Sequence, residues 1–397
     1  MKKILFVVNT MGCGGAERAL LELLGRMDWK EYEIFLYVLM GQGELIRELP
    51  SGVRLLNPVV STKSVLTGEG RRKMAGTVLR AFLRNGGYLR KGGYILRNLA
   101  EMVKRRSIRL DKLLWRVVSE GAYQFEDTFD VAVAWMEGGS AYYVADHVKA
   151  GRKKAVIHID YESAGYTKAI DGGCFQSYER IYTVSRETRE HFLAVYPGYE
   201  EKVGILPNVV DQERIRRRSQ EAGGFADGYG GIRLLTVGRL TRQKGYDFAI
   251  EVMKRLKGRG CRVRWYVLGE GDQRKALEKK IEALGLEEDF LLLGQQENPY
   301  PYYAQADIYV HATRFEGKSI AIQEAQTLGC AIVASDCNGN REQIEDGRDG
   351  ILCALEPEAM AACIAALCGD GEMRRRLGSA AEKKEFAWKE ELQHFLD

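Results

Sequence analysis

The sequence contains no long apolar run, and this absence excludes a protein anchored by membrane-spanning helices. None of its apolar stretches approaches the ~18–20 residues that a spanning helix needs. The opening residues MKKILFVVNT resemble a signal peptide only superficially, because the apolar run has five residues and glycine-rich sequence follows it. We therefore interpret this segment as a first β-strand and its turn, and we expect a cytoplasmic protein.

Ligand sets for metals and pairs for disulfides are also missing. The eight cysteines form no C-x-x-C pair and have no histidine at the spacing of a zinc site. Most of them lie in apolar segments, so we expect reduced residues of the core and predict no metal and no cofactor. They occupy positions 13, 174, 261, 330, 337, 353, 363 and 368.

What the sequence does contain is the composition of a globular protein. Of its 397 residues, 45% are hydrophobic and 29% are charged, as in soluble proteins. A chain of this length is too long for one ordinary core, so we expect two domains.

Short apolar strands alternate with helical patterns in two series, which predicts an α/β protein with two doubly wound parallel sheets. Most of these strands end in small or polar residues, where open parallel sheets place their binding sites. The expected strands of the first series are 3–9, 33–39, 53–56, 130–135, 154–159 and 180–184. Those of the second series are 232–240, 261–268, 290–293, 307–310 and 331–335.

Changes of composition suggest where the domains begin and end. Residues 1–211 are expected to form an N-terminal Rossmann-like domain with a basic helical insertion at about 62–120, and residues 232–385 a C-terminal one. The charged and then glycine-rich segment 212–231 is interpreted as the linker between them. Residues 386–397 are predicted to form an amphipathic helix outside the alternation.

Segment 71–116 carries an excess of positive charge. It contains fourteen basic residues and two acidic ones, interleaved with Leu, Ile, Phe, Tyr, Met and Trp. A basic amphipathic segment binds an anionic bilayer, because each cation near that surface adds about 1 kcal/mol. A solvated helical face is one alternative and nucleic acid another, although no recognisable nucleic-acid module accompanies the charge. We favour the membrane surface as the partner and expect no nucleic acid.

Two glutamates near a predicted helix start form the first candidate site. In HATRFEGKSIAIQEAQTLGC, residues 311–330, Glu316 precedes a helix that opens near Ser319, and Glu324 lies inside it. The first turn of a helix has unpaired N–H groups and partial positive charge, so it suits a phosphate. Glu316 can accept hydrogen bonds from sugar hydroxyls, and Glu324 from the two hydroxyls of a ribose. The alternative is an acid favoured by the helix dipole and an unrelated helical glutamate.

Three further groups of residues follow predicted strands. Arg239 and Lys244 lie five residues apart in one such loop, a pairing suited to a diphosphate leaving group. The turn with Gly14 and Gly15 lets a ligand approach the backbone, although G-x-G-x-x-G is absent and a tight turn explains it equally well. His158 ends a strand and is the histidine best placed to contact a ligand, with a purely structural histidine as the alternative.

Together these stretches resemble the large retaining glycosyltransferase family of GT-B fold that is usually numbered 4, in its bacterial surface-polysaccharide branch. The resemblance covers nearly the whole chain. It implies that two Rossmann-like domains face each other across a cleft, the C-terminal one holding the donor nucleotide and the N-terminal one the acceptor. The last helix would cross back onto the N-terminal domain. The resemblance rests on MGCGGAER at 11–18, VIHIDY at 156–161, VSRET at 184–188, LPNVVD at 206–211, VGRLTRQKGYD at 237–247, LGEG at 268–271, LGQQENPYPYYAQAD at 293–307 and FEGKSIAIQEAQTLG at 315–329.

The resemblance also implies a role for each residue that matches a motif. Arg239 and Lys244 would bind the donor diphosphate and stabilise it as it leaves. Glu316 would hold hydroxyls of the donor sugar, and His158 would lie near that sugar from the acceptor side. These four are the expected catalytic residues. Those expected to contact the phosphates, the ribose, the base or the sugar of the donor are Gly14, Gly15, Gly238, Gly269, Gly271, Gln295, Asn298, Lys318, Ser319, Ile320 and Glu324.

We therefore predict a retaining transferase that moves a hexose-type sugar from a nucleotide donor, preferably a UDP-sugar, to a glycan or polyprenyl-diphosphate-linked acceptor in surface polysaccharide synthesis. The protein would be cytoplasmic and peripheral at the inner face of the cell membrane. Lys318 and Ala321 depart from the apolar residue and the proline of many members, which leaves the sugar unassigned. The alternatives are a nucleotide-sugar epimerase of the same fold and a non-catalytic, membrane-associated scaffold.

Overall fold

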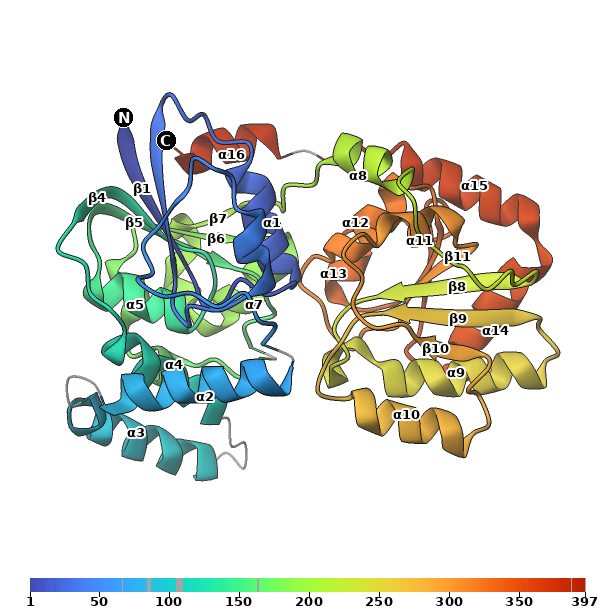
Figure 1. Ribbon diagram of the computed structural model, residues 1–397, viewed down its shortest axis with the longest axis horizontal. Coiled ribbons are helices and arrows are strands. Elements are labelled where there is room, and N and C mark those ends of the chain that lie inside the picture. Colours follow the sequence, from blue (N-terminus) through green and yellow to red (C-terminus); the bar gives the residue numbers. More distant parts are fainter. Residues whose placement is uncertain (66, 84–86, 105–109, 163, 387, 397) are drawn as a thin grey trace. The chain divides into compact units, whose positions relative to one another are not determined.

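The computed structural model describes residues 1–65, 67–83, 87–104, 110–162, 164–386 and 388–396 (Figure 1). The chain divides into two compact units, which we call the first unit (Met1–Val209 with Trp388–Asp397) and the second unit (Val210–Ala387). Among the described residues, no helix combines the length and the apolar character that crossing a membrane requires.

The first unit is built on a parallel sheet whose seven strands have the order β3-β2-β1-β4-β5-β6-β7. The chain starts at β1, winds to one edge through β2 and β3, and then continues from β4 to the other edge. The strand order therefore reverses between β1 and β4, as in doubly wound sheets. The strands are β1 (Lys2–Val8), β2 (Tyr32–Val38), β3 (Arg54–Leu55), β4 (Thr128–Ala134), β5 (Lys149–Ile157), β6 (Arg180–Thr183) and β7 (Val203–Ile205).

Helices connect these strands, and three of them follow one another between β3 and β4. The helices are α1 (Gly15–Leu24), α2 (Gly68–Leu83), α3 (Gly87–Lys104), α4 (Leu110–Gly121), α5 (Gly139–His147), α6 (Lys168–Asp171), α7 (Arg186–Val195) and α16 (Lys389–Leu396), with short 3-10 turns at Glu44–Glu48, Cys174–Ser177 and Pro197–Lys202. The last helix, α16, packs on the first unit. Lys154 Nζ donates to the carbonyl of Phe395 at 2.5 Å and Lys2 Nζ to that of Leu396 at 3.0 Å, which satisfies carbonyls that lack partners at a helix end.

The second unit repeats the plan with a parallel sheet of order β10-β9-β8-β11-β12-β13. Its strand order reverses between β8 and β11, and a separate apolar core surrounds this sheet. The strands are β8 (Ile232–Val237), β9 (Val263–Leu268), β10 (Phe290–Leu292), β11 (Ile308–His311), β12 (Ala331–Ser335) and β13 (Ile351–Cys353). The helices are α8 (Gln212–Ser219), α9 (Tyr246–Gly258), α10 (Arg274–Ala283), α11 (Tyr300–Gln305), α12 (Ile320–Thr327), α13 (Asn338–Arg341), α14 (Pro357–Gly369) and α15 (Gly371–Glu382), with a 3-10 turn at Arg242–Lys244.

The segment predicted as a linker, 212–231, is instead part of the second unit. Its first half forms α8, capped by Asp211, whose carboxylate accepts from the backbone N–H of Arg214 at 3.0 Å. Ile215 is buried in the core of the unit. In the glycine-rich half, Asp227 pairs with Arg264 at 2.8 Å. The glycine-rich composition correctly indicated turns. The partners of Ile215 and Asp227 lie far away in the sequence, so the composition of the segment could not reveal them.

Candidate functional site

The carboxyl ends of β8 and β11 define the centre of the second unit's candidate site. The two strands are paired neighbours in the sheet, through Ile308 with Leu234 and Tyr309 with Leu235. The chain leaves them toward opposite edges of the sheet, and open α/β sheets place their ligand sites at the strand ends where this reversal occurs. The loop after β8 contains Gly238, Arg239 and Lys244, and the loop after β11 contains Glu316. The fold thus brings together residues that are about 75 positions apart in the sequence.

An ion pair joins these two loops. Lys244 Nζ donates to Glu316 Oε2, and the two side chains are only 16% and 13% exposed. His311 Nε2 lies 3.4 Å from the same carboxylate oxygen, and its Nδ1 lies 3.2 Å from the hydroxyl of Tyr309. Tyr309 thus contacts His311, and His311 contacts the carboxylate of Glu316 that pairs with Lys244.

This contact keeps Glu316 ionised. Burial by itself raises the pKa of Glu316, but the adjacent Lys244 charge and the hydrogen bond from His311 lower that pKa to about 2. Burial lowers the pKa of His311, so the imidazole is neutral near pH 7 and can donate one N–H to the carboxylate. The site therefore offers a carboxylate as an acceptor and an ammonium as a donor, side by side.

Close backbone packing fixes the loops around this pair. Gly245 follows Lys244 with φ +64°, and a Cβ there would overlap the carbonyl oxygen of Ala312. At the end of β9, a Cβ on Gly269 would overlap the carbonyl of Gly238, and one on Gly271 would overlap that of Leu240. The predicted glycines thus let the loops after β8, β9 and β11 contact one another directly.

Glu324 lies inside α12 and is held by two tyrosines. It is 6% exposed, and its Oε1 and Oε2 accept from the hydroxyls of Tyr300 at 3.2 Å and Tyr303 at 3.0 Å. The tyrosines orient the carboxylate, and the sequence analysis missed both them and the helix α11 that carries them, although an i, i+3 pair of tyrosines is a usable signal of one helix face.

The other predicted residues of the second unit lie at the start of α12 and in the loops after β8 and β10. Ser319 is the N-cap residue of α12 and makes no side-chain cap, and Lys318 and Ile320 flank it. Arg239 is exposed and has no ion pair among the described residues. Gln295 is exposed in the loop after β10.

Asn298 has side-chain partners within the second unit. Its amide nitrogen donates to the carbonyl of Arg218 at 2.9 Å and to Glu221 Oε2 at 2.8 Å, while its amide oxygen accepts from Tyr300 N–H at 3.2 Å. The side chain therefore anchors the loop 294–298 to the end of α8.

Three predicted residues, His158, Gly14 and Gly15, lie in the first unit. His158 follows β5, its ring packs 5.3 Å from that of Trp135, and its backbone N–H donates to Glu137 Oε2 at 3.1 Å. Burial lowers the pKa of His158 to about 3, so the ring is neutral, and its Nε2 has no partner among the described residues. Gly14 is the N-cap residue of α1 and Gly15 its first residue. A Cβ on Gly14 would overlap the Glu17 carboxylate, so this turn carries negative charge.

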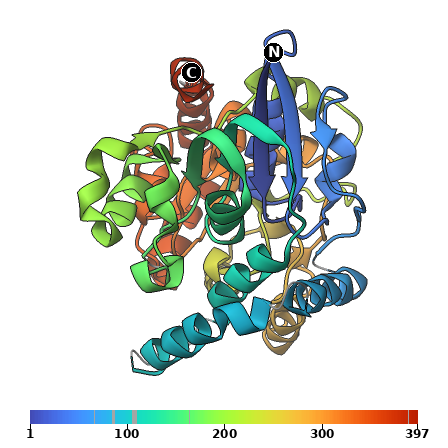
Figure 2. The same cartoon turned by 90° about the vertical axis from the view of Figure 1, so that its left-hand side faces the viewer.

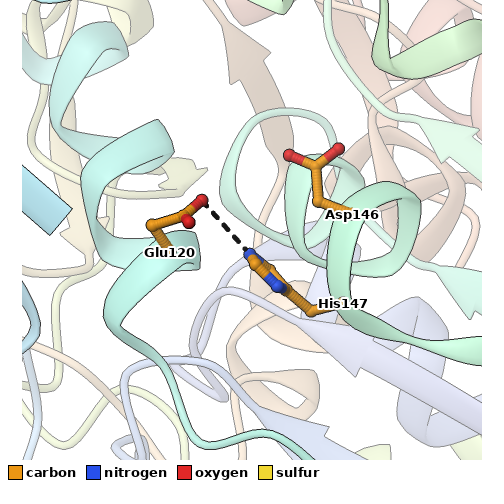
Figure 3. Close-up of side chains that lie close together, drawn as sticks. All are labelled: Glu120, Asp146 and His147. Carbon is orange, nitrogen blue, oxygen red and sulfur yellow. Dashed lines mark ion pairs between the residues drawn. The ribbon is translucent and has the colours of Figure 1, made fainter. Parts of the chain in front are cut away.

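One further group of titratable side chains joins α4 to α5 in the first unit. Figure 3 shows Glu120, Asp146 and His147, whose ligand atoms lie within 4.8 Å of one another. Glu120 lies 3.5 Å from His147 Nε2, Gln124 Nε2 lies 3.2 Å from His147 Nδ1, and Arg116 lies 3.1 Å from Asp146. Because an arginine already compensates Asp146, we interpret the group as an ion-pair contact between the two helices.

Comparisons with known proteins find relatives of the second unit. Residues 229–384 match the family described as glycosyl transferases group 1. The chain is 32% identical, over 46% of its length and 49% of the relative's, to the N-acetylgalactosamine-N,N'-diacetylbacillosaminyl-diphospho-undecaprenol 4-alpha-N-acetylgalactosaminyltransferase of Campylobacter jejuni. It is 29% identical to the amylovoran biosynthesis glycosyltransferase AmsK of Erwinia amylovora, over 49% of this chain and 47% of that one. The chain thus spans less than half the length of the first curated relatives it matches.

A solved structure extends the likeness of fold to the whole chain. The crystal structure of Anabaena Alr3699/HepE in complex with UDP and glucose has a TM-score of 0.70 and 17% identity, and the match covers 100% of this chain and 98% of that one. At this identity the likeness shows the fold alone. It confirms the prediction of a GT-B fold with two Rossmann-like domains.

Proposed function

Because its second unit belongs to the glycosyltransferase group 1 family, we propose that this protein transfers a sugar from a nucleotide donor to an acceptor in the synthesis of a surface polysaccharide. The observation that carries the proposal is the Lys244–Glu316 pair at the point where the strand order of the second sheet reverses. A nucleotide sugar combines a diphosphate, which needs cations, with hydroxyl groups, which need acceptors. This pair supplies both within one contact.

The proposed roles follow from the charges and positions of the side chains. Lys244 uses its remaining N–H groups, together with the exposed guanidinium of Arg239, to bind the diphosphate. As the bond to the sugar breaks, negative charge grows on the diphosphate, and fixed cations stabilise it where it develops. Glu316 accepts from hydroxyls of the donor sugar, and Glu324 accepts from the two ribose hydroxyls.

We propose UDP as the nucleotide, since UDP is the ligand of a solved relative of the same fold. A ligand that binds only the native state stabilises it, by about 2.7 kcal/mol at one hundred times its Kd. UDP should therefore raise the melting temperature of the wild type, and Arg239→Ala should need about tenfold more UDP for the same rise. Arg242→Ala, which removes an exposed arginine three residues away, is the matched control. An unchanged melting temperature with UDP would contradict the assignment.

We further propose that the anomeric configuration of the sugar is retained. The acceptor would attack from the face that the diphosphate leaves, and the leaving phosphate would take the acceptor's proton. Glu316 is bound to Lys244 and has a low pKa, so it is a poor general acid. The product of a reaction with an α-linked donor should therefore be α-linked by nuclear magnetic resonance. A β-linked product would contradict this mechanism.

The acceptor is proposed to be a glycan carried on a polyprenyl diphosphate. The support is the Campylobacter relative, whose name includes a diphospho-undecaprenol acceptor. Such an acceptor is held in a bilayer, so we propose that the protein works as a peripheral protein at the inner face of the cell membrane. No metal is assigned a role in this reaction.

A further inference from the structure

The three helices α2, α3 and α4 carry apolar side chains that are strongly exposed in the described part of the chain. They pack on one another and gather at one edge of the first unit (Figures 1 and 2). Their inward faces already contact the core, through Met74 and Val78 of α2 and Leu113 of α4. The same helices expose Leu79, Leu83, Leu96, Val103 and Leu114, with exposed fractions of 58%, 62%, 71%, 63% and 45%.

The spacing of these residues places two pairs of them on one side of their own helix. Leu79 and Leu83 lie one turn apart on α2, and Leu96 and Val103 lie two turns apart on α3. Nine large apolar side chains are strongly exposed among the described residues, and five of these lie on α2, α3 and α4. Single exposed leucines are ordinary, but their concentration on one group of helices is typical of an interaction site.

Positive charge accompanies the leucines. The side chains of Arg71, Arg72 and Lys73 on α2 and Arg97 on α3 are exposed and form no ion pair with another described residue. Segment 71–116 has fourteen basic and two acidic residues, whereas the net charge of the whole chain is +4, so the rest of the protein is net acidic. Ten of these fourteen basic residues belong to α2, α3 and α4, the helices that expose the leucines.

We propose that the outward face of α2, α3 and α4 docks on the surface of an anionic lipid bilayer. The inference rests on the proposed function, because a lipid-linked acceptor requires the enzyme to reach a membrane. The leucines and Val103 enter the boundary between headgroups and acyl chains, while the arginine and lysine heads stay at the level of the lipid phosphates. Nucleic acid would satisfy the cations but has no apolar layer for the leucines. The bilayer matches both features.

The test is co-sedimentation of the full chain with vesicles of mixed phosphatidylglycerol and phosphatidylcholine, and with vesicles of phosphatidylcholine alone. The wild type should bind the anionic vesicles and not the neutral ones. Arg71→Glu with Arg72→Glu should weaken this binding about tenfold or more, and Arg216→Glu with Arg217→Glu, the same charge change on exposed residues of α8, should not. Leu83→Ser should also weaken binding, whereas Val59→Ser, at a residue 74% exposed outside these helices, should not.

Three results would overturn the proposal. The first is equal binding to neutral and anionic vesicles, and the second is an equal effect of the test and control substitutions. The third is that the protein binds single-stranded RNA and not vesicles, and that the Arg71 and Arg72 substitutions abolish this RNA binding. The UDP-dependent melting temperature of each variant separates the two proposals. If UDP stabilises the wild type but vesicles do not bind, the docking surface is wrong and the transferase proposal stands. If vesicles bind as expected but UDP has no effect, the donor assignment fails and the docking surface stands.

Discussion

Glu316 is the residue on which the candidate site depends most, because its charge is maintained in a nearly buried position. Burial alone would favour the protonated acid, and Lys244 and His311 reverse this preference. The consequence can be measured as a dependence of stability on pH.

The free energy of unfolding of the wild type should exceed that of Glu316→Gln by about 2 kcal/mol at pH 7, since the substitution leaves Lys244 without its charged partner. The pKa of Glu316 falls from 4.5 in its ordinary state to about 2 in the native protein. A lowered pKa gives a contribution that is complete above about pH 4.5 and is lost as pH falls toward 2. Urea unfolding of both proteins between pH 7 and the lowest pH at which both remain folded checks this. A difference that grows with falling pH would contradict it.

The sequence predicted the acids of the site but not the groups that hold them. Glu316 and Glu324 were found because they flank a helix start after a strand, a pattern visible in one stretch of chain. Tyr300 and Tyr303 contact Glu324 only once α11 packs against α12, and His311 contacts Glu316 only once the loop after β11 folds back onto that strand. The partners of Asn298 were invisible for the same reason, because they lie at the end of α8 and just after it.

The loops around the site are held together by direct contact between their backbones as well as by side chains. Gly245 joins the 3-10 turn that carries Lys244 to α9, and it lies directly against the loop after β11. A side chain at this position would separate the two loops that the Lys244–Glu316 pair joins.

Gly245→Ala should therefore be more destabilising than an alanine at another glycine of similar backbone conformation. Gly260→Ala is the matched control, because its φ is +74° and the space around it is open. Each substitution costs about 1–2 kcal/mol for the left-handed conformation, and Gly245→Ala adds the clash with Ala312. Denaturant unfolding and UDP binding measure the two effects. Equal losses of stability in the two variants would contradict the role given to this contact.

Element by element, the sequence predicted the alternation of strands and helices well, since strands buried in a parallel sheet read as continuous apolar runs. It failed at 212–231, where glycine and charge suggested a linker. There α8 is stabilised by the burial of Ile215 and by the N-cap Asp211. In the sequence alone, these two residues are a weaker signal than the charged and glycine-rich composition around them. Four of the basic residues that contributed to the membrane prediction, Arg84, Arg105, Arg106 and Arg109, lie outside the described residues.

At the scale of the whole molecule, the two sheets have the same topology but different chemistry at the ends of their strands. The second unit places Arg239 and Lys244 beside Glu316, whereas the first places a neutral His158 near Glu137 and a glycine turn beside Glu17. This asymmetry supports a division of labour in which the second unit binds the anionic donor.

We propose above that the Lys244–Glu316 site turns over a nucleotide sugar. The most direct measurement is release of UDP from a panel of UDP-sugars by the wild type, Glu316→Ala and Arg239→Ala, with Glu288→Ala, an exposed acid outside the site, as control. We expect turnover of one sugar by the wild type and the control, and a loss of about 100-fold or more in both site variants. Turnover that survives unchanged in Glu316→Ala and Arg239→Ala would contradict the account.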